Sequence, residues 1–196
     1  MNVLVVYCHP CADSFVAAVK DAALSGLAKA GHAVRIVDLY GDGFEPAMSA
    51  EERRRYHDAG VNEAPVADHV AHLKWAEALL FIYPTWWYNL PAMLKGWLDR
   101  AFVPHVAFVM PTATQGIRGN LRNIRRIDVV TTCGASWHVS KLMGEPGRRT
   151  LTRGLRAICH PFCRTSYTAL YKMDTVSPER RTRYLAEVSA RCARIR

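Results

Sequence analysis

Five residues that could hold a planar ligand follow a run of five consecutive apolar residues. They are Pro84, Thr85, Trp86, Trp87 and Tyr88. A loop is a poor place to bury three large rings, because its backbone polar groups also need partners. Rings at this position are suited to stacking on a flat molecule, while packing over a hydrophobic core is the simpler alternative.

A second stretch contains groups that could bind a phosphate. His9 offers a ring nitrogen and Ser14 a hydroxyl, and the helix expected from Phe15 and Val16 would point free amides toward an anion. Neither the glycine-rich dinucleotide motif nor the Gly-Lys-Ser/Thr phosphate loop is present. A phosphate loop of another type is therefore needed, and a His-Pro turn with a serine cap explains the stretch equally well.

The third stretch is the loop at 131–136, at the end of another apolar run, and its candidate ligand-binding residues are Thr131, Thr132, Cys133 and Gly134. Small residues directly after a strand let backbone amides come close to a ligand. By itself this motif is weak.

Cys8 and Cys11 permit a different chemistry. A Cys-x-x-Cys pair after a strand and at the start of a helix is the setting of a thioredoxin-like dithiol. Thioredoxin-like domains are shorter than this chain and need no aromatic loop, so the dithiol is the less favoured alternative. Cys159 and Cys163 form a second pair, but their spacing is not convincing for structural zinc, and we expect no metal site.

The elements that must position these stretches are those of a parallel α/β sheet. Apolar runs predict strands at 2–7, 33–39, 79–83, 126–132 and 167–171. Helical spacing predicts helices that begin near Ser14, Val66, Pro91, Lys141 and Ser177, the fourth continuing to Arg156. In such sheets ligands bind at the carboxyl ends of the strands, so we expect the three stretches to meet there.

Two connections are long. Residues 40–65 contain glycines, prolines and a charged run, which indicates a surface excursion with a short helix. The segment from Phe102 to Asn123 has little periodicity, and its first half is too apolar for disorder. An exposed apolar loop of this kind predicts a partner surface.

Composition indicates one domain over residues 1–196. Half of the residues are hydrophobic, and no apolar run reaches the ~18 residues that a membrane span needs. The N-terminal apolar run is too short for a signal peptide, so we expect a cytoplasmic protein without a membrane span. The net charge of +9 favours anionic partners, but the basic residues are dispersed and no nucleic-acid motif accompanies them. We expect no nucleic-acid partner.

The stretch from Tyr83 to Arg100 resembles the central motif of the NAD(P)H:quinone oxidoreductases, which are flavoproteins of flavodoxin-like fold. Their pattern is roughly Pro-x-x-Trp-aromatic-x-x-Pro-Ala-x-Leu-Lys-Gly-Trp, and the match here is long. The stretch from His9 to Val16 is similar to the family's His-Pro-x-x-x-Ser-Phe-Asn phosphate loop, with Val16 in place of asparagine. The third resembles its Thr-Thr-Gly-Gly segment, with Cys133 at the first glycine, where a positive φ would strain a cysteine.

The resemblance implies a five-stranded parallel sheet with helices on both faces and a bound flavin, FMN or FAD. It implies hydride transfer from NAD(P)H through the flavin to a quinone or similar acceptor in a ping-pong cycle, with the flavin rather than a catalytic side chain carrying the chemistry. It further implies a homodimer and a substrate pocket that includes Trp87, Tyr88 and Phe108. His138 lies beyond the third stretch at a spacing that does not match the family, and it receives no role.

Two other functions fit the same resemblance. Some relatives are flavin-bearing regulatory subunits of cation/proton antiporters, and copurification with a membrane transporter would favour that role. A one-electron carrier similar to flavodoxin is the other, but carriers of that type tend to be acidic and this chain is basic.

Overall fold

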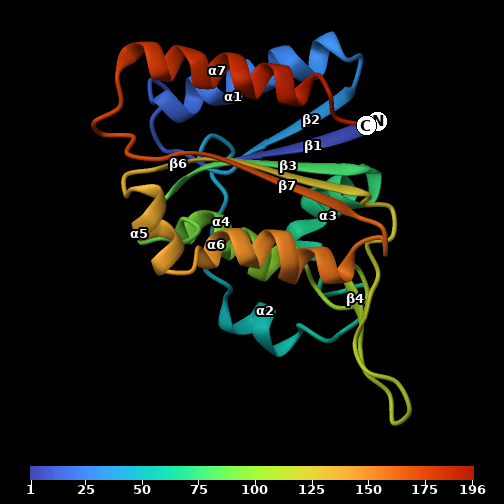
Figure 1. Cartoon of the computed structure of the whole chain (residues 1–196). Coiled ribbons are helices and arrows are strands. Elements are labelled where there is room, and N and C mark those ends of the chain that lie inside the picture. Colours follow the sequence, from blue (N-terminus) through green and yellow to red (C-terminus); the bar gives the residue numbers. More distant parts are fainter.

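Five apolar runs of the chain form a parallel sheet in the order β2-β1-β3-β6-β7 (Figure 1). The computed structural model describes all residues 1–196. The central strands are almost wholly buried because helices cover both faces of the sheet, whereas most positions of the two edge strands are exposed or half-buried. The strands are β1 (Asn2–Tyr7), β2 (Ala33–Asp38), β3 (Ala78–Thr85), β6 (Arg126–Cys133) and β7 (Arg164–Leu170). The expected flavodoxin-like architecture is confirmed.

Two long helices, α1 (Phe15–Lys29) and α7 (Pro178–Cys192), cover one face of the sheet (Figure 1). Their close contact depends on Gly26, since a Cβ atom there would lie 2.2 Å from the Ser189 carbonyl oxygen. Helices α3 (Ala67–Trp75) and α4 (Ala92–Ala101) lie on the other face, where Trp97 and Leu73 are fully buried in the larger core. The surface excursion at 40–65 contains the short elements α2 (Ala50–Arg54) and η1 (Ala64–Val66).

The prediction of one continuous helix over 141–156 is wrong. The segment is divided because Gly144 and Glu145 adopt positive φ values of 80° and 47°, and Pro146 then starts a new helix without an amide to donate. The observed elements are α5 (Trp137–Leu142), α6 (Pro146–Arg149), the π-helix η2 (Thr150–Gly154) and the 3₁₀-helix η3 (Leu155–Ile158).

The connection from Phe102 to Asn123 contains a small antiparallel hairpin, formed by β4 (Phe108–Val109) and β5 (Arg118–Gly119). Its apolar first half is not the exposed loop that the sequence indicated, because Val103 and Val106 are buried in the core. Only the tip at 111–118 is exposed throughout.

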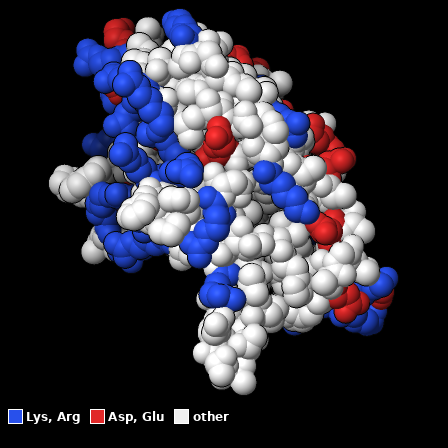
Figure 2. All heavy atoms as spheres, turned by 90° about the vertical axis from the view of Figure 1, so that its right-hand side faces the viewer, with Lys and Arg blue, Asp and Glu red and all other residues white.

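The positive charge of the chain is unevenly distributed over the face drawn in Figure 2. Figure 2 shows the molecule from the side on which the strands begin, and Lys and Arg side chains form a broad band along one border of this face. None of the helices has both the length and the apolar character needed to cross a membrane.

Candidate functional site

The turn after β3 presents two of the predicted aromatic side chains in a strained backbone. Trp86 and Asn89 exchange backbone hydrogen bonds of 3.2 and 2.9 Å, and Trp87 and Tyr88 between them have φ values of 47° and 60°. Two consecutive positive φ values are the pattern of a type I′ turn, which ordinarily favours Asn and Gly. Each non-glycine residue there costs about 1–2 kcal/mol. Large aromatic rings therefore occupy these two positions at a cost in backbone strain.

The Trp87 side chain is 94 % exposed, so the turn is not a lid over the hydrophobic core. Trp86 is 41 % exposed, and its ring centre lies 6.2 Å from that of His9. The alternative that this aromatic cluster is ordinary core packing is thereby excluded for Trp87.

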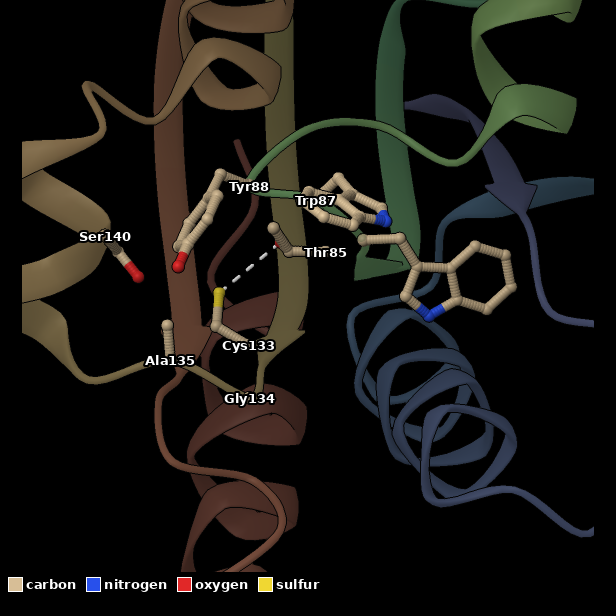
Figure 3. Close-up of a pocket in the computed structure, with 8 residues that line it drawn as sticks. Thr85, Trp87, Tyr88, Cys133, Gly134, Ala135 and Ser140 are labelled. Carbon is tan, nitrogen blue, oxygen red and sulfur yellow. Dashed lines mark hydrogen bonds between the residues drawn. The ribbon is translucent and has the colours of Figure 1, made fainter.

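Side-chain hydroxyls join the carboxyl ends of β3 and β6. Thr85 pairs with Cys133 in the sheet, and its Oγ1 lies 3.0 Å from the Thr131 Oγ1 and 3.4 Å from the Cys133 Sγ, which donates to it (Figure 3). Cys133 has no positive φ, so it replaces glycine without the backbone strain considered above. Burial raises the pKa of the Cys133 thiol, and the group is therefore a neutral hydrogen-bond donor at physiological pH.

These residues surround a cavity of about 620 Å³, here called the aromatic pocket. In Figure 3 the Tyr88 ring stands across the pocket from Trp87, and the Ser140 hydroxyl points toward the pocket from α5. Five of the eight lining residues are hydrophobic, which is typical of a site for a largely apolar, planar group. They are Thr85, Trp86, Trp87, Tyr88, Cys133, Gly134, Ala135 and Ser140.

A second cavity of about 340 Å³, here called the loop crevice, lies beside the first turn of α1. Ser14 caps this helix by accepting a hydrogen bond of 3.1 Å from the Ala17 amide, and His9 Nδ1 accepts one of 3.0 Å from the Cys11 amide. The amides of Phe15 and Val16 have no acceptor within the helix, so they are available to an anion. The crevice is lined by His9, Ser14, Phe15, Val16, Pro84, Thr85, Trp86, Thr132, Gly134, Met173 and Asp174.

The structure thus brings together the three predicted stretches. All of their predicted ligand-binding residues except Thr131 line one of the two cavities, and Thr131 lies beneath them, bonded to Thr85. Thr85, Trp86 and Gly134 line both cavities, so the two are adjacent.

Phe108 is placed elsewhere. It lies in β4, paired with Gly119 and packed against the larger core, and it lines neither cavity of this chain. His138 also lines neither cavity, and its ring centre lies 4.9 Å from that of Trp137 on α5.

Cys8 and Cys11 have opposite environments. Cys8 is buried at the end of β1 and Cys11 is exposed, and both are free thiols. Burial raises the pKa of the Cys8 thiol to about 12, whereas a dithiol nucleophile requires a lowered value. This geometry counts against the dithiol alternative. No group of three or more potential metal ligands exists.

Four lining residues were not foreseen from the sequence: Ala135, Ser140, Met173 and Asp174. Asp174 reaches the loop crevice from the connection after β7, and its Oδ2 would lie 2.8 Å from a Cβ atom at Gly134. Ala135 lies within the predicted loop at 131–136 but is not among the ligand-binding residues expected there. Nothing local in the sequence marks the other three.

Next to the aromatic pocket, the buried carboxylate of Glu145 is the centre of a charged cluster. It accepts hydrogen bonds from Lys141 Nζ at 2.5 Å, from Arg148 at 2.8 Å and from the Tyr171 hydroxyl at 2.7 Å. Burial alone would raise the pKa of Glu145, but these three donors outweigh it, and the pKa lies below its ordinary value. The cluster holds the turn between α5 and α6 in its positive-φ conformation.

Comparison with known proteins agrees with this geometry. A family model described as flavodoxin-like fold matches residues 1–195. NAD(P)H dehydrogenase (quinone) 1 of Rattus norvegicus is 30% identical over 160 residues, which are 74% of this chain and 57% of that protein. Ribosyldihydronicotinamide dehydrogenase (quinone) of Mus musculus is 33% identical over 126 residues, 56% of this chain and 54% of the relative. The chain spans about half the length of the curated relatives it matches.

Solved structures of similar size match over nearly the whole chain. Smu.1420 from Streptococcus mutans UA159 is 27% identical with a TM-score of 0.86 and full coverage of both chains. The NAD(P)H:quinone oxidoreductase from Methanothermobacter marburgensis is 25% identical with a TM-score of 0.83, covering 98% of this chain and 96% of that one.

Proposed function

Because this chain belongs to the flavodoxin-like fold family, we propose that it is a flavin-dependent NAD(P)H:quinone oxidoreductase. The observation that carries the proposal is the pairing of an aromatic pocket, bordered by the exposed Trp87, with a loop crevice at the first turn of α1. A flavin has the same two parts, a flat apolar ring and an anionic phosphate. The names of the rat relative and of the Methanothermobacter protein support the same activity.

The residues present fit a flavin, FMN or FAD. The Phe15 and Val16 amides and the Ser14 hydroxyl would bind the phosphate, with His9 beside them. The ring would lie in the aromatic pocket, with the 85–88 turn on one side and Cys133 and Gly134 on the other. A bound flavin would supply hydride transfer between a nicotinamide and an acceptor, while the protein would supply orientation and electrostatics.

The chain's own groups contribute binding and exclusion of water. Trp87 and Tyr88 offer ring faces on which a nicotinamide or a quinone can stack, each aromatic pair adding ~0.5–1.5 kcal/mol beyond burial. Backbone amides of the turn can donate to the polar edge of the ring, where negative charge develops on reduction. NAD(P)H and the quinone-like acceptor would occupy the same pocket in turn, which is a ping-pong order.

A homodimer is part of the proposal. Leu142 is 79 % exposed on α5, and Trp137 and Met143 are about half exposed beside it. An apolar surface of this kind next to an open pocket is suited to a second copy of the chain. Phe108 lines neither cavity of its own chain, so a role for it in the substrate pocket would have to be in the pocket of the second copy.

The direct test is to denature the purified protein and identify the flavin released. Apoprotein supplied with flavin at a hundred times its dissociation constant should gain ~2.7 kcal/mol in unfolding free energy. Under anaerobic conditions, NADH or NADPH should bleach the flavin absorbance and a quinone should restore it. A colourless protein whose melting temperature is unchanged by both FMN and FAD would overturn the proposal.

A further inference from the structure

A third cavity, of about 180 Å³, lies behind the aromatic pocket and has an entirely polar lining. Four of its seven lining residues are cations, Lys141, Arg148, Arg149 and Arg153. We call this cavity the basic pocket. Its single carboxylate is Glu145, so the formal charge of the lining is about +3, counted as four cations and one anion. Its volume suits a group the size of a phosphate rather than a whole nucleotide.

The four cations are not equivalent. Lys141 and Arg148 are held by Glu145 at 2.5 and 2.8 Å, so their positions are fixed before any ligand arrives. Arg149 and Arg153 are exposed and form no ion pair and no side-chain hydrogen bond within the chain. Two fixed and two free cations around one hollow are an arrangement that a dianion would satisfy, because guanidinium groups bind phosphate oxygens in pairs.

The backbone conformation around Arg149 and Arg153 also supports an anion-binding site. Arg149 and Arg153 are four residues apart across the start of η2, so like charges adjoin on one helical surface and repel each other. The element itself is a π-helix, a rare conformation that occurs frequently at functional sites. The repulsion between the two arginines and the π-helix both destabilise the fold. An anion bound between the arginines would relieve the repulsion.

The basic pocket adjoins the aromatic pocket. Ser140 lines the aromatic pocket and the next residue, Lys141, lines the basic one, so the two cavities lie on neighbouring sides of α5. Between them lies a void of about 10 Å³, room for about one water molecule, lined by residues of both, among them Tyr88, Cys133, Glu145 and Arg148. A molecule with one end on the aromatic pocket would therefore reach the basic pocket over the protein surface and not through this void.

We propose that the basic pocket binds the 2′-phosphate of NADPH and so makes the phosphorylated nicotinamide nucleotide the preferred electron donor. This inference rests on the proposed function, since it takes the nicotinamide end to lie in the aromatic pocket. The molecule is longer than that pocket, and its adenosine end has to leave it. A phosphomonoester carries about two negative charges at neutral pH, and the basic pocket supplies two cations that nothing else neutralises.

The test uses the protein as purified and two probes that differ by one phosphate, adenosine 2′,5′-bisphosphate and adenosine 5′-monophosphate. Calorimetry should show tighter binding of the bisphosphate by about tenfold or more. The double variant Arg149→Gln/Arg153→Gln should lose this difference. Arg125→Gln/Arg164→Gln is the matched control, because it removes two exposed arginines at the opposite end of the sheet and should keep the difference.

Kinetics provide the second readout. The ratio of kcat/KM for NADPH to that for NADH should fall about tenfold in the double variant and stay constant in the control. Equal binding of the two probes by the unaltered protein would overturn the proposal, whether or not the protein reduces quinones. The donor assignment would also be overturned if the double variant raised KM only for a carboxylated quinone, because the anion would then belong to the acceptor.

Discussion

Trp86 and Asn89 close a four-residue turn with two mutual backbone hydrogen bonds, and this closure holds Trp87 at a φ of 47°. The Trp87 side chain gains almost no burial in return, since 94 % of it is exposed. The backbone strain of the turn therefore destabilises the ligand-free chain, and only contact of Trp87 with a bound molecule can offset it. Ligand-free protein should gain stability when this residue is replaced by one that tolerates the left-handed region.

Trp87→Asn tests that consequence. Asparagine adopts positive φ more readily than other non-glycine residues, so the unfolding free energy of the apoprotein should rise by about 0.5–1 kcal/mol in urea titrations. Quinone reductase activity should fall, because a stacking surface is lost. Trp87→Phe is the control, since it keeps both the ring and the strain. An apoprotein that Trp87→Asn destabilises would show that the indole contributes to the fold itself.

Ser14→Asp separates the capping role of Ser14 from the proposed phosphate contact. Aspartate is as good an N-cap as serine, so the melting temperature of the apoprotein should change little. Its negative charge would face the flavin phosphate, and flavin retention should drop about tenfold or more. Ser14→Asn offers the same cap without the charge. Flavin content in Ser14→Asp equal to that of the unaltered protein would remove the phosphate from this loop.

The environments of the cysteines predict how they react. Only Cys11 is exposed among the six thiols. A colorimetric thiol reagent at pH 8 should therefore modify about one thiol rapidly in the folded protein and all six after unfolding, and Cys11→Ser should abolish the rapid phase. Two rapid thiols that disappeared together on mild oxidation would instead support a Cys8–Cys11 dithiol.

Glu145 predicts a specific dependence of stability on pH. Its pKa is lowered in the folded state, so the stability it contributes is complete above its unfolded value near 4.5 and is lost as pH falls through the folded value. Glu145→Gln should cost about 1–2 kcal/mol at pH 7, because Lys141 and Arg148 are partly exposed and water screens them. The difference from the unaltered protein should shrink toward pH 3.

Glu51→Gln is the matched control for that measurement. Glu51 pairs with Arg54 at 3.4 Å on the surface, and both side chains are more than two-thirds exposed. Its replacement should change stability little at any pH. A constant difference between Glu145→Gln and the unaltered protein from pH 7 to pH 3 would indicate that the carboxylate charge is not what stabilises the α5–α6 turn.

The sheet and the meeting of the three loops could be predicted because both follow from short-range patterns. Continuous apolar runs mark strands buried on two faces, and parallel strands bring their carboxyl ends to one edge. Thr85 and Cys133, 48 residues apart, are paired in register for this reason. The family resemblance added the ligand, which no periodicity could have identified.

What escaped prediction depends on contacts that are distant in sequence or on single backbone angles. Asp174 reaches the loop crevice only because β7 lies beside β6, and nothing near it in the sequence marks a site. The break at Glu145 does have a signal, since glycine and proline flank that residue, but the helical spacing of 141–156 predicts a continuous helix. No feature of the sequence signals the positive φ of Tyr88, because tyrosine rarely adopts that conformation.

The solvated indole of Trp87 also gives this molecule an optical probe of its own. Among the five tryptophans, Trp97 is completely shielded and should emit at short wavelength, whereas Trp87 is the most exposed and should contribute most to the red edge of the fluorescence spectrum, beside the half-exposed Trp86 and Trp137. An isoalloxazine beside Trp87 would quench that emission most strongly by energy transfer. Quenching that is largest at the red edge, at a rate that follows flavin addition, would report occupancy of the site without any label or substrate.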